Sequence, residues 1–244
     1  MFMSGGRTIP FVRVPGHDHA AIGYALDAGA SLVIPQVETV EECRRVLSYA
    51  KFGTNHNGTR SYPPFRLIPG LTDGLYDPSR PIHENLNDQA AIMIQIETLQ
   101  GIENLDAILT ACPEVDAVWL GTLDCRVSMN LAGNSGMGGP EPEWLGAVEK
   151  FGEILKKHNK PRGGFGLGPP EMMKQSGTGC AFVTVAADVL QLLGLGEALC
   201  QAREVFPPLK MGEALPDIQG TKRVEEGKVA NGEQKIVVNG AGPE

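Results

Sequence analysis

The chain has 244 residues, enough for one (β/α)₈ barrel or for two modest domains. Hydrophobic residues make up 42% of it and charged residues 20%, so we expect a buried core rather than general disorder. The net charge of −8 argues against nucleic acid as a partner. We find no apolar run long enough to cross a membrane, no secretory signal pattern and no paired cysteine motif among the five cysteines. We therefore expect a cytoplasmic protein that does not bind membranes.

Short apolar runs alternate with helical patterns along most of the chain. The sequence predicts strands at 8–14, 31–37, 90–98, 115–121, 161–167 and 180–186. It predicts helices at 17–30, 38–52, 99–112, 141–160, 169–177 and 187–206. Because the apolar runs are continuous rather than alternating, the strands are expected to be parallel and covered on both faces. Six such βα units predict an α/β fold, either a doubly wound sheet or a barrel.

Individual residues support these helix assignments. Asp18 and Thr39 stand where the caps of the first two helices are expected, and Thr39 is followed by acidic residues in the first helical turn. Gly29 stands where a left-handed residue should end the first helix.

Two segments do not follow the alternation. Residues 53–89 are rich in Asn, Pro, Gly and Arg, and we interpret them as a long loop that serves a function or an oligomer contact. Residues 212–244 mix charged residues with Gly, Asn and Pro, and we expect a disordered tail there. The predicted barrel domain therefore covers residues 1–211.

Polar residues cluster at the predicted strand ends, which is where parallel α/β folds place their reactive groups. They are Arg13, Gln36, Gln95, Glu97 and Asp124. Glu97 and Asp124 follow neighbouring strands and could together bind a hard divalent cation, or each could simply cap the helix that follows it.

Two further features of the first βα unit leave alternatives open. Arg13 could bind a substrate carboxylate or a developing oxyanion, or could form an internal ion pair. His17 and His19 have the spacing of a metal-binding pair, although we favour a position on the rim of the fold.

Three segments, 11–42, 94–109 and 115–129, resemble the HpcH/HpaI family of metal-dependent pyruvate aldolases. The resemblance extends over about residues 8–206, and its most specific part is the Ile-Glu-Thr segment at 96–98 followed by an Asp after the next strand. It implies a (β/α)₈ TIM-type barrel that assembles as a homo-oligomer, a trimer or a hexamer.

The resemblance also assigns roles to individual residues. Glu97 and Asp124 match the two metal ligands, with Mg²⁺ as the expected ion and Mn²⁺ or Co²⁺ as alternatives. Arg13 matches a catalytic arginine that contacts the keto or enolate oxygen of a small 2-oxo acid, and Gln95 matches a glutamine beside the metal. Gly121, Thr122 and Leu123 match the turn that binds the substrate carboxylate. Arg60, in a loop that also resembles the family, is a further candidate.

The sequence departs from the family pattern in two places. Thr122 and Leu123 replace a Pro-Ala pair, which alters the carboxylate-binding turn. The family has eight βα units and six are readable here, so we expect an incomplete barrel that lacks the first two units and the histidine base carried by the second. Open sheet edges then predict either oligomer contacts or poor solubility.

Three functions are compatible with these features. The first is a carbon–carbon lyase that works through a pyruvate enolate, either a 2-oxo acid aldolase or an oxaloacetate decarboxylase, with activity impaired by the missing base. The second is a catalytically inactive remnant, or the partner of a full-length aldolase. The third is an acyl-CoA lyase similar to the citrate lyase β subunit, which the acidity of the chain disfavours.

Overall fold

The computed structural model describes residues 8–62 and 77–205. The predicted tail at 212–244 and the middle of the predicted loop at 53–89 lie outside these residues. The chain divides into two units, Met1–Leu190 and Gln191–Glu244, and each is considered by itself. The strands and the candidate site belong to the first unit, and the described part of the second unit is helical.

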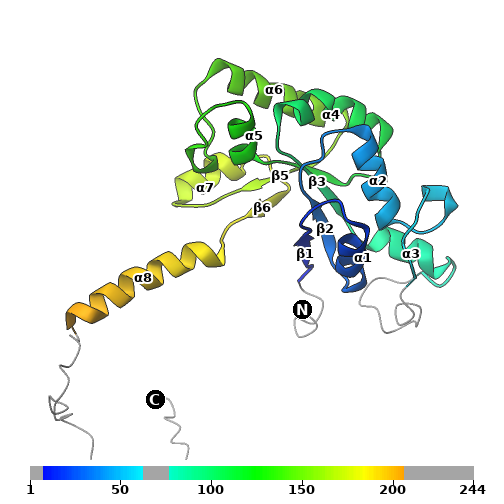
Figure 1. Cartoon of the computed structure of the whole chain (residues 1–244), viewed down its shortest axis with the longest axis horizontal. Coiled ribbons are helices and arrows are strands. Elements are labelled where there is room, and N and C mark those ends of the chain that lie inside the picture. The colour runs from blue at the N-terminus through cyan, green and yellow to red at the C-terminus, as the bar shows by residue number, and fades with distance from the viewer. Residues whose placement is uncertain (1–7, 63–76, 206–244) are drawn as a thin grey trace, which may run out of the picture. The chain divides into compact units, whose positions relative to one another are not determined.

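Six parallel strands form a single curled sheet in which the spatial order equals the order along the chain (Figure 1). The strands are β1 (Phe11–Arg13), β2 (Ser31–Ile34), β3 (Ile92–Ile96), β4 (Ala117–Leu120), β5 (Arg162–Phe165) and β6 (Phe182–Thr184). All five pairings between neighbours are parallel. The prediction of six βα units is confirmed, and the described residues hold six strands of a TIM-barrel-like α/β fold in which eight would complete the barrel.

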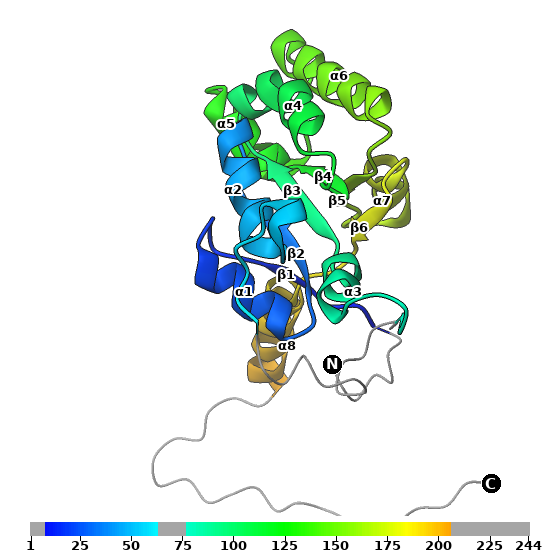
Figure 2. The same ribbon diagram turned by 90° about the vertical axis from the view of Figure 1, so that its right-hand side faces the viewer.

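The helices are α1 (His19–Asp27), α2 (Val40–Ala50), α3 (Ile82–Gln89), α4 (Leu99–Ala111), α5 (Thr122–Ser128), α6 (Pro142–Lys157), α7 (Pro170–Gly177) and α8 (Asp188–Val205). Two short 3₁₀ helices, η2 (Thr54–His56) and η4 (Asn134–Gly136), lie in the connections. Helices α1, α2, α4 and α6 pack one after the other around the sheet, as Figure 2 shows. None of the described helices is long and apolar enough to cross a membrane.

The predicted helix ends are confirmed. The side chain of Asp18 accepts a hydrogen bond from the N–H of Ala21 at the start of α1. Thr39 and Glu42 form a reciprocal capping box at the start of α2. Gly29 has the left-handed φ of 81° that the end of α1 requires.

The core has two parts because alternate strand residues face opposite sides of the sheet. Leu32 and Ile34 of β2 pack with the helices in the larger cluster. Val33, between them, faces inward and packs with Met93 and Trp119 in a second cluster made of strand residues. The rings of Phe11 on β1 and Phe182 on β6 lie 5.0 Å apart, so the sheet curls enough for inner side chains of its first and last strands to touch.

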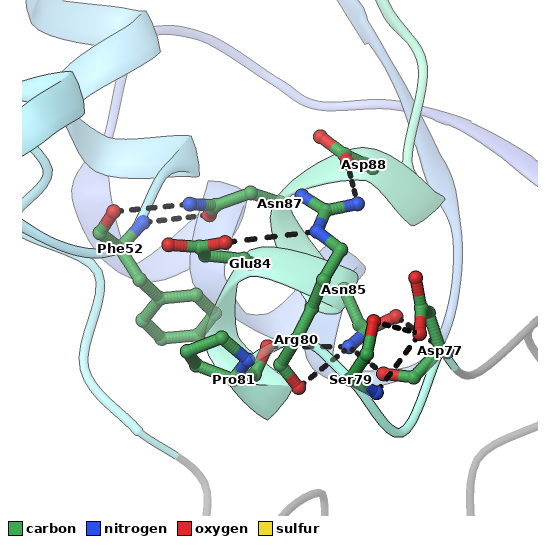
Figure 3. A network of polar contacts seen from close by, with 9 residues as sticks. All are labelled: Phe52, Asp77, Ser79, Arg80, Pro81, Glu84, Asn85, Asn87 and Asp88. Atoms are coloured by element: carbon green, nitrogen blue, oxygen red, sulfur yellow. Dashed lines mark hydrogen bonds and ion pairs between the residues drawn. The ribbon is translucent and has the colours of Figure 1, made fainter.

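The prediction that residues 53–89 form one long loop is wrong in part, because α3 and η2 occupy some of this range. Figure 3 shows the polar contacts that hold α3, a helix made mostly of polar residues, in place. The side chain of Asn87 accepts a hydrogen bond from the N–H of Phe52 (2.8 Å) and donates one to the carbonyl of the same residue (3.0 Å). Asn85 forms an equivalent pair of bonds with the backbone of Asp77, and Arg80 pairs with Asp88 at 2.7 Å.

Candidate active site

The inner face of the sheet changes from apolar to polar toward the carboxyl ends of the strands. Arg13 ends β1, Gln95 lies two residues beyond the inward-facing Met93 on β3, and Glu97 follows β3 directly. The Nε of Arg13 donates a hydrogen bond to Oε1 of Gln95 at 2.7 Å. A second guanidinium nitrogen of Arg13 lies 3.7 Å from Oε1 of Glu97. The structure therefore brings together three of the predicted site residues, from two strands that do not pair with each other.

Exposure differs sharply within this cluster. The side chain of Glu97 is 4% exposed and that of Arg13 is 52% exposed. Gln95 is buried and holds the guanidinium at its Nε edge. Arg13 is thus fixed at one edge while its outer N–H groups remain accessible to a bound molecule.

The carboxylate of Glu97 is held from two sides. The backbone N–H of Gln36, which follows β2, donates to Oε2 of Glu97 at 2.9 Å. Gln36 has a φ of 49°, which is uncommon for a residue that is not glycine and is often found at functional sites. On the other side lies Gly121, where a Cβ atom would stand 2.9 Å from Oε1 of Glu97. The rigid backbone on both sides fixes where this carboxylate can lie.

Glu97 and Asp124 act on each other electrostatically. Burial is the main cause that raises the pKa of Glu97, and the negative charge of Asp124 raises this pKa further, whereas the Gln36 N–H and Arg13 partly offset both effects. Asp124 is exposed and lies in the first turn of α5. Glu97 does not cap α4, because Thr98 does, whereas Asp124 lies in the first turn of α5 after the N-cap residue Gly121.

These two carboxylates suit a divalent cation. They supply hard oxygen donors, and a positive ion between them would remove the repulsion that raises the pKa of Glu97. Within 8–62 and 77–205, no group of three or more His, Cys, Asp or Glu side chains converges on one point. The protein would therefore supply two ligands, and substrate or water the rest.

The predicted carboxylate-binding turn forms the start of α5. Gly121 is its N-cap residue, and Thr122 and Leu123 are its first two residues, so their backbone N–H groups lie in the turn that has no partners inside the helix. The hydroxyl of Thr122 donates to the carbonyl of Leu120 at 3.5 Å. The side chain of Leu123 is half-exposed and packs toward Gly133 of the following loop.

Arg60 has a different environment from the other candidates. Its guanidinium forms an ion pair with Asp27, the last residue of α1, at 2.9 Å, and lies 4.5 Å from the centre of the Phe52 ring. Its side chain is 3% exposed. These contacts connect the end of α1 with the segment after α2.

A cavity of about 420 Å³ opens beside the cluster, where the connections after β1 and β2 meet. It is lined by Gly16, His17, Pro35, Gln36, Glu38 and Glu42. The Nε2 of His17 lies 2.7 Å from the carbonyl oxygen of Pro35, whereas the Nε2 of His19 lies 3.2 Å from the carbonyl of Thr59. The two histidines thus contact different segments, and His17, unlike His19, lines the cavity.

His17 is only weakly marked in the sequence. The signal available was its position four residues after Arg13, at the carboxyl end of β1. Its decisive contact, with Pro35, comes from the next βα unit and cannot be read from local spacing.

A curled parallel α/β sheet with a charged cluster beyond its strand ends defines an incomplete TIM-barrel-like fold. The comparisons with known proteins specify the family. A family model for HpcH/HpaI aldolase/citrate lyase matches residues 1–151, and the chain belongs to this family.

Several relatives have names and structures that agree with this assignment. A 5-keto-4-deoxy-D-glucarate aldolase of Enterobacter sp. (strain 638) is 28% identical over 194 residues, which cover 78% of this chain and 70% of the relative. A hydroxypyruvate/pyruvate aldolase of Pseudomonas aeruginosa is 30% identical over 190 residues, 75% of this chain and 65% of the relative. The crystal structure of macrophomate synthase superposes with a TM-score of 0.68 at 35% identity, covering 84% of this chain and 69% of that one.

Proposed function

We propose that this chain is a metal-dependent carbon–carbon lyase that acts through a pyruvate enolate, as a 2-oxo acid aldolase or an oxaloacetate decarboxylase. The observation that carries the proposal is the cluster of Arg13, Gln95 and Glu97, with Asp124 close enough to raise the pKa of Glu97. Two of the relatives described above are named as aldolases, one for 5-keto-4-deoxy-D-glucarate and one for hydroxypyruvate and pyruvate.

Glu97 and Asp124 would hold the metal ion, for which we propose Mg²⁺, with Mn²⁺ or Co²⁺ as possible substitutes. When bound, the ion would supply Lewis acidity toward the keto oxygen of a 2-oxo acid. Gln36 and Gly121 keep the Glu97 carboxylate in place, so the ligand is positioned before the ion binds.

Arg13 supplies a positive charge to the same substrate oxygen. The bond from its Nε to Gln95 fixes the plane of the guanidinium and leaves the outer N–H groups to donate. An enolate oxygen carries more negative charge than the ketone from which it forms, so these donors stabilise the enolate more than the substrate. Gln95 is accordingly a positioning residue.

The carboxylate of the 2-oxo acid would bind at the start of α5. The backbone N–H groups of Thr122 and Leu123 are available there, next to the Glu97 and Asp124 side chains. In this orientation the C2 oxygen would face the guanidinium of Arg13, where negative charge develops during the reaction.

Decarboxylation of oxaloacetate makes the smallest demand on this site. The bond between C3 and the C4 carboxylate breaks and CO₂ leaves. The electron pair of that bond forms the C2–C3 double bond while the carbonyl π pair moves onto the C2 oxygen, and the resulting enolate of pyruvate then takes a proton from water at C3. No proton has to move before the bond breaks, so the cluster alone can support this reaction. Aldol cleavage additionally requires a group that accepts a hydroxyl proton.

The proposal is tested by oxaloacetate decarboxylation in Mg²⁺, corrected for the rate without protein. We expect Glu97→Gln and Asp124→Asn each to lower kcat/KM by about 100-fold or more. Asp106→Asn, which alters a carboxylate paired with Lys157 and His158 on the outer helices, is the matched control and should retain activity. Full activity in Glu97→Gln would refute the role of this residue, and an inactive wild-type chain would favour the non-catalytic alternative.

We further propose that the chain is a homo-oligomer, a trimer or a hexamer. Among the described residues, β1 and β6 are the edge strands of the sheet, and unpaired strand edges favour association. Size-exclusion chromatography with light scattering should therefore give a mass above that of one chain. A well-folded monomer would contradict this expectation.

A further inference from the structure

The segment that joins β2 to α2 holds a conformation that its own sequence does not favour. Gln36 has a left-handed φ of 49°, which glutamine, unlike glycine or asparagine, rarely adopts. Such a conformation persists only where the surrounding structure enforces it. Within the sheet, the N–H of Val37 donates to the carbonyl of Gln95 at 3.1 Å. This bond fixes the residue after Gln36, and further contacts come from outside the sheet.

Helix α4 provides these further contacts. Nδ2 of Asn104, half-buried in the second turn of α4, donates to the carbonyl oxygen of Glu38 at 2.8 Å. Gly101 stands three residues earlier, on the same face of the helix. A Cβ atom on Gly101 would lie 3.3 Å from the carbonyl oxygen of Val37, so the glycine leaves room for this carbonyl. Two successive carbonyl groups of the segment thus lie against α4.

The same helix follows the proposed metal ligand. Thr98, the residue after Glu97, is the N-cap of α4. The N–H of Gln36 donates to Oε2 of Glu97 at 2.9 Å. Helix α4 therefore begins beside Glu97 and reaches back, through Asn104, to the segment that holds the Glu97 carboxylate. Because the internal hydrogen bonds of a helix keep its backbone fixed, these contacts form a closed ring in which each part restrains the next.

We propose that Asn104 is a positioning residue for the metal site, which keeps residues 36–38 in the conformation that directs the Gln36 N–H at Glu97, with Gly101 leaving the space for this conformation. The inference rests on the proposed metal-dependent function. It extends the site to α4, a helix that contributes no ligand of its own.

The φ of Gln36 sets the orientation of the peptide group that donates to Glu97. Without the bond from Asn104, Gln36 can relax toward the negative φ values that glutamine favours. Its N–H then turns away from Glu97, while Gly121 and Arg13 still contact this carboxylate. A partial loss of metal affinity is therefore expected.

The test is Mn²⁺ binding, measured by isothermal titration calorimetry on the full chain at neutral pH, together with urea denaturation in EDTA. We expect Asn104→Ala to lower the affinity for Mn²⁺ about tenfold, and no more than Glu97→Gln does. Asn87→Ala is the matched control, because it also removes bonds from an asparagine side chain to backbone, but beyond the other end of α2. This control should lower the urea midpoint and leave the affinity for Mn²⁺ unchanged.

A second substitution separates positioning from general stability. Asparagine adopts left-handed φ values more readily than glutamine, so Gln36→Asn combined with Asn104→Ala should recover most of the lost affinity. A mere loss of packing around Asn104 would not respond to a change at residue 36. Gly101→Ala, whose added Cβ presses on the Val37 carbonyl, reaches the same segment by another route and should also lower the affinity.

Wild-type affinity in Asn104→Ala, or in Gly101→Ala if the first variant does not fold, would overturn the proposal. So would a loss that Gln36→Asn does not restore, because it would reduce Asn104 to a residue that stabilises the fold. A wild-type chain that does not bind Mn²⁺, or Glu97→Gln with wild-type affinity, would instead refute the metal site of the proposed function, and the role of Asn104 with it.

Discussion

Gly121 lies so close to Glu97 that no side chain fits between them. A Cβ atom on Gly121 would stand 2.5 Å from Cγ of Glu97 and 3.2 Å from its carboxyl carbon. The backbone φ of Gly121 is −75°, a value that any residue can adopt, so the close approach and not the conformation is what requires glycine here. The start of α5 thus determines where the Glu97 carboxylate lies.

Gly121→Ala should therefore displace the Glu97 carboxylate. We expect kcat/KM for oxaloacetate decarboxylation to fall at least about tenfold, because catalysis by oriented groups is sensitive to displacements of about 1 Å. Gly146→Ala on α6 is the control, since nothing lies within 4 Å of its added Cβ. That variant should retain activity and gain about 0.5–1 kcal/mol in urea denaturation. Normal activity in Gly121→Ala would show that the carboxylate need not be fixed.

Arg13→Lys should keep the positive charge but lose the hydrogen bonding that the planar guanidinium makes on two edges. Lysine cannot bind Gln95 through one nitrogen while it presents others to a substrate, so we expect kcat to fall by about 100-fold. Gln95→Leu should give a smaller loss in kcat, because Arg13 remains but is no longer fixed. Steady-state kinetics of decarboxylation measure both, and an Arg13→Lys enzyme with wild-type kcat would exclude the proposed oxyanion contact.

The raised pKa of Glu97 predicts a pH-dependent cost in stability. In the absence of divalent ions, the folded protein binds the Glu97 proton more tightly than the unfolded chain does, so this group contributes stability at low pH and loses it as the pH rises through the raised pKa. Glu97→Gln should then be at least as stable as the wild type at pH 7, and this advantage should disappear below the unfolded pKa near 4.5. Urea denaturation in EDTA across this pH range measures the sign of the stability difference between Glu97→Gln and the wild type.

Arg126 and Glu141 should stabilise the helix that carries Asp124. Arg126 on α5 is completely buried, and two of its nitrogens donate to the two carboxylate oxygens of Glu141 at 2.8 Å. This pairing lowers the pKa of Glu141 to about 2. Glu141→Gln should lower the urea midpoint at pH 7, because it leaves a buried guanidinium without its partner.

The stabilisation that the Arg126–Glu141 ion pair gives should be lost at low pH. A lowered pKa means that the stabilisation is complete above the usual pKa of 4.5 and is lost as the pH falls toward about 2. The difference between the wild type and Glu141→Gln should therefore shrink as the pH is lowered from 5 to 2. A difference that stays constant over this range would contradict the ion pair.

The sequence was sufficient to predict β2 and β4 because apolar residues dominate both strands. Leu32, Val33 and Ile34 are all buried, although they face opposite sides of the sheet, which is the pattern of a covered parallel strand. The position of Glu97 at the carboxyl end of the sheet could also be predicted, because Glu97 comes directly after β3.

The sequence did not indicate α3 or α5, for two different reasons. The eight residues of α3 are mostly polar, and their order depends on the bonds that Asn85 and Asn87 make to distant backbone (Figure 3). The seven residues of α5 are too few to show a helical period.

The left-handed conformation of Gln36 and the contact of His17 were also beyond reach from the sequence. Glutamine gives no signal for a positive φ, and the bond of His17 to Pro35 joins two separate βα units. These are tertiary features that local sequence spacing does not show.

Binding of Mn²⁺, measured by isothermal titration calorimetry on the full chain at neutral pH, tests the central claim most directly. We expect one ion per chain in the wild type and a loss of at least about tenfold in affinity in both Glu97→Gln and Asp124→Asn, with Asp106→Asn unchanged. Equal affinity in the wild type and in both site variants would show that Glu97 and Asp124 do not share a metal ion, and the enolate chemistry proposed for this cluster would be wrong.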